Sequence, residues 1–333
     1  MELRVAVLGG GSFGTTVASL ASRNAPTVLW ARRADLIDEI NREHRNERYL
    51  AGYALPEALR ATASLEEAVR EADVVIMGVP SHGFRAVLEE VRDHIRPWVP
   101  LVSLAKGLEQ GTHLRMTEVI QETLPEHRAG VLTGPNLAKE IMAGFAAASV
   151  IAIDDAMVAT QLQGVFHSGV FRTYTNDDVI GCELGGALKN VIAIASGMGD
   201  GLGVGDNTRS AVITRGLAEL TRLGMAMGGR EQTFAGLAGM GDLIATCVSS
   251  QSRNRRVGEE LGKGRKLQDI IDEMNQVAEG VKTSKVVIEL AEKYGVDMPI
   301  AREVYGVVHQ GATAMDAYRG LTRRPAGAER EPA

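Results

Sequence analysis

Hydrophobic and polar positions divide the chain into two regions with different periods. In the first, short apolar runs rich in β-branched residues alternate with stretches of helical spacing, a pattern that predicts parallel strands joined by crossover helices. From about residue 180 onward, apolar residues recur only at helical spacing between glycine and proline turns, which predicts an all-helical region. The predicted strands are residues 4–8, 27–31, 74–78, 101–104, 130–132, 150–153 and 170–175.

Three glycines follow the first predicted strand. Gly9, Gly11 and Gly14 form a G-x-G-x-x-G pattern at the passage from this strand into a helix. In that setting the first glycine permits a tight turn, the second lets the backbone approach a pyrophosphate, and the third lets helix and strand pack closely. The pattern favours a dinucleotide-binding Rossmann domain over a glycine-rich turn that binds nothing.

The predicted fold is therefore α/β plus all-α. We expect an NAD(P)-binding Rossmann domain over residues 1–180, a helical substrate and catalytic domain over 181–322, and a disordered tail over 323–333, where charged residues, proline and alanine show no apolar pattern. A chain of 333 residues with 45% hydrophobic residues is long enough for two such cores.

The second strand ends in two arginines. In "TVLWARR", Arg32 and Arg33 stand where a site that prefers NAD carries an acid for the ribose 2′-hydroxyl. A guanidinium at this place pairs with a 2′-phosphate instead. NADP(H) is favoured as the cofactor and NAD(H) is tolerated; a solvated basic strand end is the alternative interpretation.

A lysine lies inside a helix that is otherwise apolar. In "ELGGALKNVIAIASGMGDG", residues 183–201, Lys189 lies beside the buried stripe, with the small residues Gly185 and Ala193 four positions away on either side. An unpaired buried charge is costly. Either this lysine extends to water, or a groove over its small neighbours admits an anion.

Other candidate substrate residues follow strands or begin helices. Lys106 follows a strand, as does the Gly-Pro-Asn turn of "TGPNLAKEI", residues 133–141. Asp242 follows a glycine turn at a predicted helix start, and residues 252–254, Ser-Arg-Asn, begin the next helix, where N–H groups and a guanidinium suit a phosphate. Each has an ordinary alternative, as a helix cap or a solvated basic face.

Taken in order, these motifs resemble the bacterial type of NAD(P)-dependent glycerol-3-phosphate dehydrogenase. The resemblance covers nearly the whole chain up to the tail. It rests on "GGGSFGT", "LWARR", "VPSH", "SLAKGLE", "GPNLAKE", "ELGGALKNVIAIASGMGDGL", "GLAGMGDLIATC", "SRNRRVG" and "AEGVKT".

The resemblance implies reversible reduction of dihydroxyacetone phosphate to sn-glycerol 3-phosphate, for phospholipid synthesis. It assigns the proton donor and acceptor role to Lys189, with Lys106 and Asp242 beside it. The implied substrate residues are Lys106, Gly134, Asn136, Lys189, Asn190, Asp242, Ser252, Arg253 and Asn254. The implied cofactor residues, beyond the three glycines, are Ser12, Phe13, Arg32, Arg33, Lys106, Ala138, Arg253, Val277 and Glu279. Many relatives carry Trp or Tyr at position 13 and Ser or Thr at position 136.

Composition excludes several classes. A net charge of −6 argues against a general binder of nucleic acid or anionic membranes. Cys182 and Cys247 are far apart in sequence and the histidines are scattered, so no disulfide framework or metal site is indicated. The start of the chain has no signal peptide pattern, and the apolar run around 145–153 is too short to span a bilayer. We expect a cytoplasmic protein, and a homodimer is consistent with the helical domain.

Two rival functions remain at this point. Another dehydrogenase with the same two-domain plan, such as one acting on 3-hydroxyacyl-CoA or a sugar acid, would need a histidine base or a large acyl pocket, and no histidine occurs between 182 and 205. A catalytically silent NADP(H)-binding sensor would be free to lose Lys106, Lys189 or Asp242, and all three are present.

Overall fold

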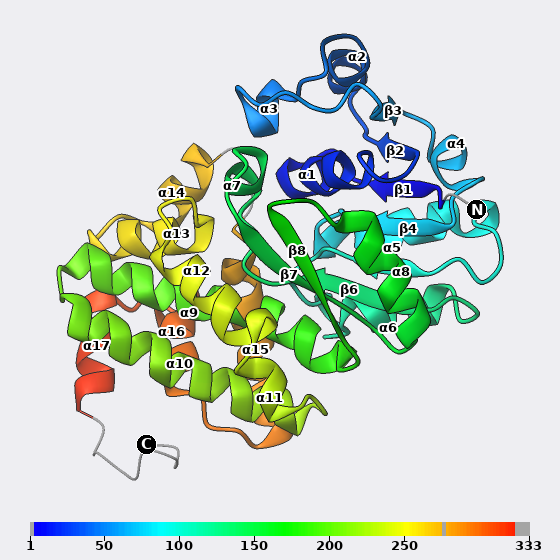
Figure 1. The fold of residues 1–333 in the computed structure, drawn as a ribbon. Helices are drawn as coiled ribbons and strands as arrows, with labels where there is room; N and C mark the ends of the chain where they lie inside the picture. Colours follow the sequence, from blue (N-terminus) through cyan, green and yellow to red (C-terminus); the bar gives the residue numbers. More distant parts are fainter. Residues whose placement is uncertain (1–2, 275–277, 324–333) are drawn as a thin grey trace. The chain divides into compact units, whose positions relative to one another are not determined.

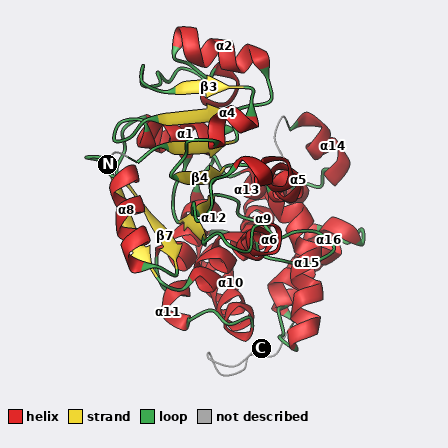
Figure 2. Cartoon of the chain, turned by 90° about the vertical axis from the view of Figure 1, so that its right-hand side faces the viewer, coloured by secondary structure: helices red, strands yellow, loops and turns green. Residues whose placement is uncertain are grey.

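The computed structural model describes residues 3–274 and 278–323. Its chain divides into two compact units. The first contains residues 1–105 and 114–179, and the second contains residues 106–113 and 180–333. Figure 1 labels their helices and strands, and Figure 2 shows that the described strands belong to the first unit, whereas the second is helical.

The first unit is built on one eight-stranded sheet with the order β3-β2-β1-β4-β5-β6-β7-β8. The order departs from β1 in both directions, as in doubly wound nucleotide-binding folds. All neighbouring strands are parallel except β6 and β7. The strands are β1 (Val5–Leu8), β2 (Thr27–Trp30), β3 (Arg60–Thr62), β4 (Val74–Met77), β5 (Leu101–Ser103), β6 (Ala129–Thr133), β7 (Ala147–Ile153) and β8 (Phe171–Asn176).

Helices cover both faces of this sheet. Alternate residues of β1 enter different cores: Val5 and Val7 pack with α1, α2 and α8, whereas Ala6 and Leu8 pack with α4, α5 and α6. Burial on both faces explains why the strands read as continuous apolar runs. The helices of this unit are α1 (Ser12–Ala21), α2 (Ala34–Glu43), α3 (Glu47–Leu50), α4 (Leu65–Val69), α5 (Ser81–Val91), η1 (Arg92–His94), α6 (Met116–Thr123), α7 (Ala138–Met142) and α8 (Ala156–Phe166).

The seven predicted strands are all present, but the structure corrects two points. Strand β3 was not predicted, because three residues give too short a pattern to recognise. The parallel sheet expected from the sequence also contains an antiparallel pair, with Gly130 opposite Ile153. The link between these strands contains only the five-residue helix α7, and the chain returns in the opposite direction.

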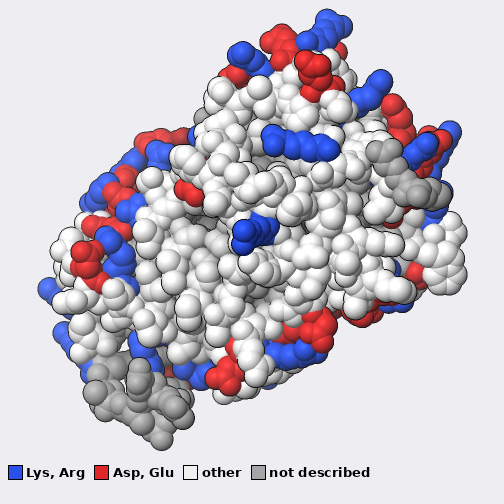
Figure 3. All heavy atoms as spheres, in the orientation of Figure 1, with Lys and Arg blue, Asp and Glu red and all other residues white. Residues whose placement is uncertain are grey.

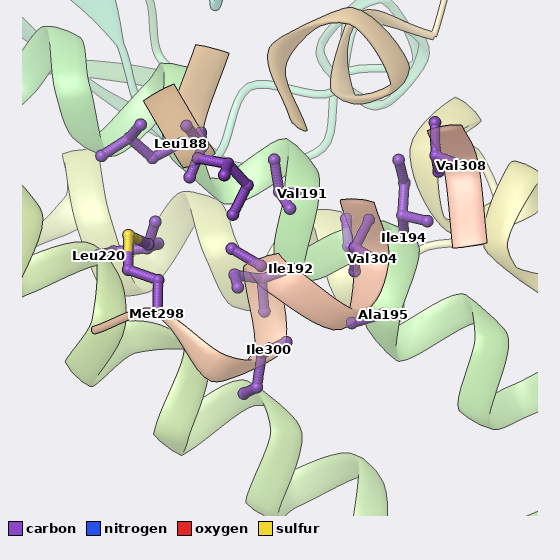
Figure 4. Close-up of a cluster of buried hydrophobic side chains, with 14 of the residues drawn as sticks. Leu188, Val191, Ile192, Ile194, Ala195, Leu220, Met298, Ile300, Val304 and Val308 are labelled. Carbon is purple, nitrogen blue, oxygen red and sulfur yellow. The ribbon is translucent and has the colours of Figure 1, made fainter. Parts of the chain in front are cut away.

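The second unit packs its helices around one apolar core. Figure 4 shows how side chains of α9, α10 and α16 meet in this core, among them Leu188, Ile192, Leu220 and Val304. The helices are α9 (Val179–Leu202), α10 (Asp206–Ala226), α11 (Glu231–Phe234), η2 (Leu237–Gly241), α12 (Asp242–Val248), α13 (Arg253–Gly262), α14 (Leu267–Glu273), α15 (Glu279–Tyr294), α16 (Pro299–His309) and α17 (Ala314–Thr322).

The segment 106–113 differs from the predicted domain division. It falls within the predicted Rossmann domain of residues 1–180, but its contacts belong to the helical unit. Leu108 is buried in the helical core, and the Lys106 carbonyl accepts a hydrogen bond from Asn190 Nδ2 at 2.9 Å. Residues 324–333 of the predicted tail lie outside the described residues.

Helix α9 is the longest apolar helix. By length and composition it could cross a membrane, yet 89% of its most apolar window is buried inside the structure. Such burial is typical of the central helix of a protein core. No other helix within residues 3–274 and 278–323 meets the same criteria.

A buried acid joins α10 to α16. Glu219 accepts hydrogen bonds from the Ile300 and Ala301 N–H groups, at 2.7 and 3.2 Å, so its carboxylate caps the helix that Pro299 begins. Burial raises the pKa of Glu219 to about 7, against the opposing effect of the two N–H groups and Arg222, and Asp297 raises it further.

This raised pKa predicts a stability change with pH. Because the folded-state pKa lies above the ordinary value of 4.5, the contribution of Glu219 is fully present below pH 4.5 and is lost as the pH rises through about 7. We therefore expect the wild type to lose stability between pH 5 and pH 8 relative to Glu219→Gln, which does not titrate. Urea unfolding midpoints of both proteins at these two pH values test this, and an unchanged difference would contradict it.

Candidate functional site

The glycine-rich loop of the first unit has the geometry that a bound diphosphate requires. Gly9 has a φ of +131°, and a Cβ there would lie 2.5 Å from the Gly78 carbonyl oxygen. A Cβ on Gly14 would lie 2.0 Å from the Gly9 carbonyl oxygen. These two glycines are therefore required by the protein's own packing.

Gly11 differs, because a Cβ at this position would meet no protein atom within 4 Å. Gly11 is the N-cap of α1 and has no side chain that could cap the helix, so the first-turn N–H groups open toward this space. Packing in the described protein does not require a glycine here, whereas a diphosphate at the helix N-terminus does. The residues present fit a dinucleotide.

Asn46 supports this loop and was not found from the sequence. Its Nδ2 donates to the Gly10 carbonyl at 3.1 Å and lies 2.9 Å from Thr15 Oγ1. Of the predicted cofactor residues, Ser12 donates to the Tyr49 carbonyl at 3.1 Å, and Phe13 packs against the sheet core. The partners of Asn46 in the glycine loop and α1 are more than 30 positions away, so no local pattern could reveal this support, although Asn46 also caps α3 by accepting from the Tyr49 N–H at 3.2 Å.

The two arginines after β2 have different environments. Arg33 donates from Nε to Asp35 Oδ1 at 3.0 Å, and its second nitrogen pairs with the other carboxylate oxygen. The hydrogen bond to Asp35 raises the pKa of the exposed Arg33 guanidinium. Arg32 is exposed and lies over the Trp30 ring, with its guanidinium carbon 6.0 Å from the ring centroid. The two arginines are equivalent in the sequence pattern, and Asp35 distinguishes them in the structure.

The Gly-Pro-Asn turn and α7 also belong to the first unit. Gly134 is buried with a φ of +122°, and Asn136 is buried with its Nδ2 3.4 Å from Ser149 Oγ. Ala138 begins α7, which packs against α1, the helix that follows the glycine loop.

In the second unit, one buried carboxylate is shared by two lysines. Asp242 Oδ1 lies 2.7 Å from Lys189 Nζ, and Asp242 Oδ2 lies 2.8 Å from Lys106 Nζ. The side chains of Asp242 and Lys189 are 3% and 5% exposed, whereas that of Lys106 is 17% exposed. The sequence predicted all three residues, and the structure joins them in one cluster.

The packing of η2 against α9 brings the acid to the lysine. A Cβ on Gly185 would lie 2.6 Å from the Ala238 carbonyl oxygen, so a side chain there would push η2 away. The predicted glycine turn before Asp242 is a π-helical turn that packs closely over Gly185, one of the small neighbours of Lys189. Lys189 is therefore largely buried beside an anion of the chain itself, the Asp242 carboxylate.

Thr246 completes the surroundings of Lys189. It lies one turn after Asp242 on α12, hydrogen bonds to Lys189 Nζ, and donates to the Asp242 carbonyl at 2.6 Å. Thr246 is not among the residues predicted from the sequence, although its spacing of four residues from Asp242 places both on one helix face.

The cluster perturbs Lys106. Burial lowers the pKa of Lys106 to about 8; Asp242 and Glu279 oppose this effect and Lys189 adds to it. Two ammonium groups share one carboxylate here, so the three side chains carry a net positive charge. An anionic group of a ligand would complete their charge balance.

Two asparagines connect this cluster to α13 and α15. Asn190 Nδ2 donates to the Lys106 carbonyl, and its Oδ1 accepts from Asn254 Nδ2 at 2.9 Å. Asn254 Oδ1 then accepts from the Gly280 N–H at 2.9 Å. This chain of hydrogen bonds links the Lys106 segment to α9, and α9 in turn to α13 and α15.

The remaining predicted residues lie at helix starts. Ser252 caps α13 by accepting from the Arg255 N–H at 3.2 Å, and Arg253 is exposed in the first turn of this helix. Glu279 is the first residue of α15. Val277 lies outside the described residues.

No group of three or more His, Cys, Asp or Glu residues that could hold a metal occurs in the described part of the chain. Cys182 and Cys247 are buried, and neither is part of a disulfide in the described structure. Figure 3 shows acidic and basic residues interspersed around the rim of the face drawn there.

Comparisons with known proteins find matches in both the N-terminal and the C-terminal region of the chain. The family models for the N-terminus and C-terminus of NAD-dependent glycerol-3-phosphate dehydrogenase match residues 4–159 and 178–319. The chain is 62% identical to "Glycerol-3-phosphate dehydrogenase [NAD(P)+] 2" of Sphingopyxis alaskensis, over 100% of both chains. It is 56% identical to the Mycobacterium avium enzyme with the same activity in its name, over 98% of this chain and 96% of the relative.

Among solved structures, the glycerol-3-phosphate dehydrogenase of Coxiella burnetii superposes with a TM-score of 0.92 at 36% identity, over 97% of this chain and 99% of that one. Identity of this extent along the whole length, in both matched regions, shows the family. The chain belongs to the NAD-dependent glycerol-3-phosphate dehydrogenases.

Proposed function

We propose that this protein interconverts dihydroxyacetone phosphate and sn-glycerol 3-phosphate, with Lys189 as the group that gives and takes the proton. The observation that carries this assignment is the carboxylate of Asp242, which lies within 2.8 Å of both Lys189 Nζ and Lys106 Nζ. A fixed ammonium group in a largely buried cluster suits the oxygen of a ketone that gains negative charge as it is reduced.

The proposed reaction uses both units of the chain. When bound at the loop of Gly9, Gly11 and Gly14, NADPH or NADH supplies a hydride to the ketone carbon of the substrate. Lys189 donates a proton from Nζ to the ketone oxygen and is left as a neutral amine, which regains a proton from solvent. Asp242 holds Lys189 in place throughout, since it accepts from Nζ at 2.7 Å.

Lys106 has a different role in this proposal. Its cationic Nζ stabilises the developing alkoxide without giving up its proton, and its effect is stronger where water is excluded. Its carbonyl is held by Asn190, so its backbone has a defined position next to α9. In this proposal Asn190 and Asn254 position the Lys106 backbone, in addition to the substrate contacts that the family resemblance implies for them.

The phosphate group of the substrate binds, in this proposal, at the start of α13. The N-terminus of this ten-residue helix offers N–H groups and a favourable dipole, and Arg253 adds an exposed guanidinium in its first turn. Gly134 and Asn136 are the proposed substrate residues of the first unit. Binding energy at the phosphate is remote from the reacting carbon and helps to hold the substrate for the chemical step.

The physiological setting is also proposed. The expected role is to supply glycerol 3-phosphate for phospholipid synthesis, in the cytoplasm and as a homodimer. The sensor hypothesis requires that the protein bind cofactor and leave dihydroxyacetone phosphate unchanged.

A steady-state assay with dihydroxyacetone phosphate and either NADPH or NADH tests the function. We expect turnover by the wild type and a loss of about 100-fold or more in Lys189→Ala, as for removal of an acid–base group. NADPH binding should be nearly unaffected. Lys285→Ala, which removes an exposed lysine of the same unit, is the matched control and should keep full activity. Near-normal turnover by Lys189→Ala would refute the role of Lys189, and cofactor binding without turnover in the wild type would favour the sensor.

The lowered pKa of Lys106 predicts an alkaline limit to activity. Lys106 is cationic below its pKa of about 8 and loses its charge above it, so kcat/KM should fall as the pH rises through about 8. Lys106→Arg keeps the cation to much higher pH and should move this limit upward even where it lowers the maximum rate. Measured pH profiles of both proteins test this, and an unmoved limit would assign the titration to another group.

The environments of the two arginines predict the source of cofactor preference. Because Arg33 is paired with Asp35, Arg32 is the residue that we propose for the 2′-phosphate of NADPH. Arg32→Ala should raise the Kd for NADPH by about tenfold and leave the Kd for NADH nearly unchanged. Fluorescence titration measures both values, with Arg42→Ala as a control that removes an exposed arginine of α2. Equal losses for the two cofactors would contradict the proposal.

A further inference from the structure

Helices α9 and α13 approach each other until their backbones touch. A Cβ on Gly197 would lie 2.0 Å from the Arg255 carbonyl oxygen, and a Cβ on Gly258 would lie 2.0 Å from the Ile194 carbonyl oxygen. No side chain fits at either position without moving a helix. The close contact therefore depends on a glycine from each partner.

The same contact repeats one turn further along. A Cβ on Gly201 would lie 2.2 Å from the Glu259 carbonyl oxygen, and a Cβ on Gly262 would lie 2.5 Å from the Met198 carbonyl oxygen. Contact positions advance in the same direction on both helices, so the two helices run parallel. Two successive contacts fix how far α13 can slide along α9, where a shift of one residue is about 1.5 Å.

A buried carboxylate lies at the far end of this contact. Asp200 of α9 accepts from Arg255 Nε at 2.8 Å through Oδ2. Its Oδ1 accepts from Arg209 Nε and Nη2 at 2.9 and 2.5 Å. The Asp200 side chain is 8% exposed, so both oxygens are committed to these two guanidinium groups.

Arg255 connects this carboxylate to the first turn of α13. Its backbone N–H donates to Ser252 Oγ, the cap of the helix, while its side chain reaches Asp200. Its neighbour Asn254 is held by Asn190, which follows Lys189 on α9. The first turn of α13 is thus tied to α9 through two consecutive side chains.

We propose that Asp200 is a positioning residue for the substrate phosphate: through Arg255 it holds the first turn of α13, with Arg253, in register with Lys189 on α9. Lys189 and Asp200 are eleven residues apart on one helix, about 16 Å along its axis. Helix α9 therefore sets the distance between the proton-donating group and the phosphate-binding turn. None of the motifs that suggested the function assigned a role to Asp200, Arg209 or Arg255.

The proposal, which rests on the proposed function, predicts a selective effect. Loss of the Asp200 charge leaves Arg255 with its longer contact to Glu259 on the same helix, at 3.5 Å, in place of the 2.8 Å pair that ties it to α9. The turn that binds the phosphate is then held less firmly, whereas Lys189, Asp242 and Thr246 keep their contacts. Phosphate binding should weaken more than the chemical step slows. A merely structural role would lower thermal stability and leave the ratio of these two effects unchanged.

Asp200→Asn tests this, because it removes the charge and keeps the shape. We expect the KM for dihydroxyacetone phosphate to rise about tenfold, as for a lost charge-assisted contact, with kcat changed by less than about threefold. The inhibition constant of inorganic phosphate should rise in parallel, and Asp200→Glu should restore part of the affinity. The matched control is Asp206→Asn. Asp206 is an exposed partner of the same Arg209, and its removal leaves the pair of Asp200 with Arg255 in place.

An unchanged KM for dihydroxyacetone phosphate in a folded Asp200→Asn protein would overturn the proposal. An equal rise of this KM in Asp206→Asn would overturn it as well. If Asp200→Asn does not fold, Arg255→Gln removes the same ion pair from its more exposed side and must show the same KM rise. Calorimetric titration with inorganic phosphate needs no turnover, so a wild type that binds phosphate more tightly than Asp200→Asn but reduces no substrate would refute the proposed function alone.

Discussion

The shared carboxylate of Asp242 is the constraint on which the helical unit depends. Two lysine ammonium groups this close together repel each other, and each would be costly to bury alone. One carboxylate that accepts from both makes the arrangement stable and leaves a net positive charge. Gly185 is small so that η2 can approach and deliver this acid. The close packing of η2 on α9 at Gly185 therefore also brings the Asp242 charge to the two lysines.

Glycines in this chain mark two different requirements. At Gly9, Gly14, Gly197 and Gly258 a Cβ would collide with a neighbouring carbonyl, so the protein's own packing requires a small residue. At Gly11 nothing of the described protein stands in the way. A glycine without a packing reason, at the start of a helix that no side chain of its own caps, indicates that something outside the chain must approach there.

Local patterns allowed much of this to be predicted from the sequence. Strand runs, the glycine loop and the lysine of an apolar helix each extend over a few residues, so they can be read without knowing the fold. Contacts between distant segments could not be read in this way. Asn46 supports the glycine loop, Asp200 holds α13, and residues 106–113 join the helical unit because of partners more than 30 positions away. Asp35 and Thr246 were within reach, because each lies two to four residues from a residue already singled out.

A chain with a net charge of −6 that acts on a phosphate ester must concentrate positive charge where the ligand binds. The helical unit does this at two places. At the first place, the two lysines exceed the single charge of Asp242. At the second, Arg253 adds a guanidinium to the first turn of α13, and Asp200 holds its neighbour Arg255. In both places a carboxylate with little exposure holds a cationic side chain in position. Helix α9 supplies Lys189 to the first place and Asp200 to the second, so this rigid helix fixes the distance between them. A substrate that carries its phosphate and its carbonyl at another separation would reach one place and miss the other, and specificity follows from that difference.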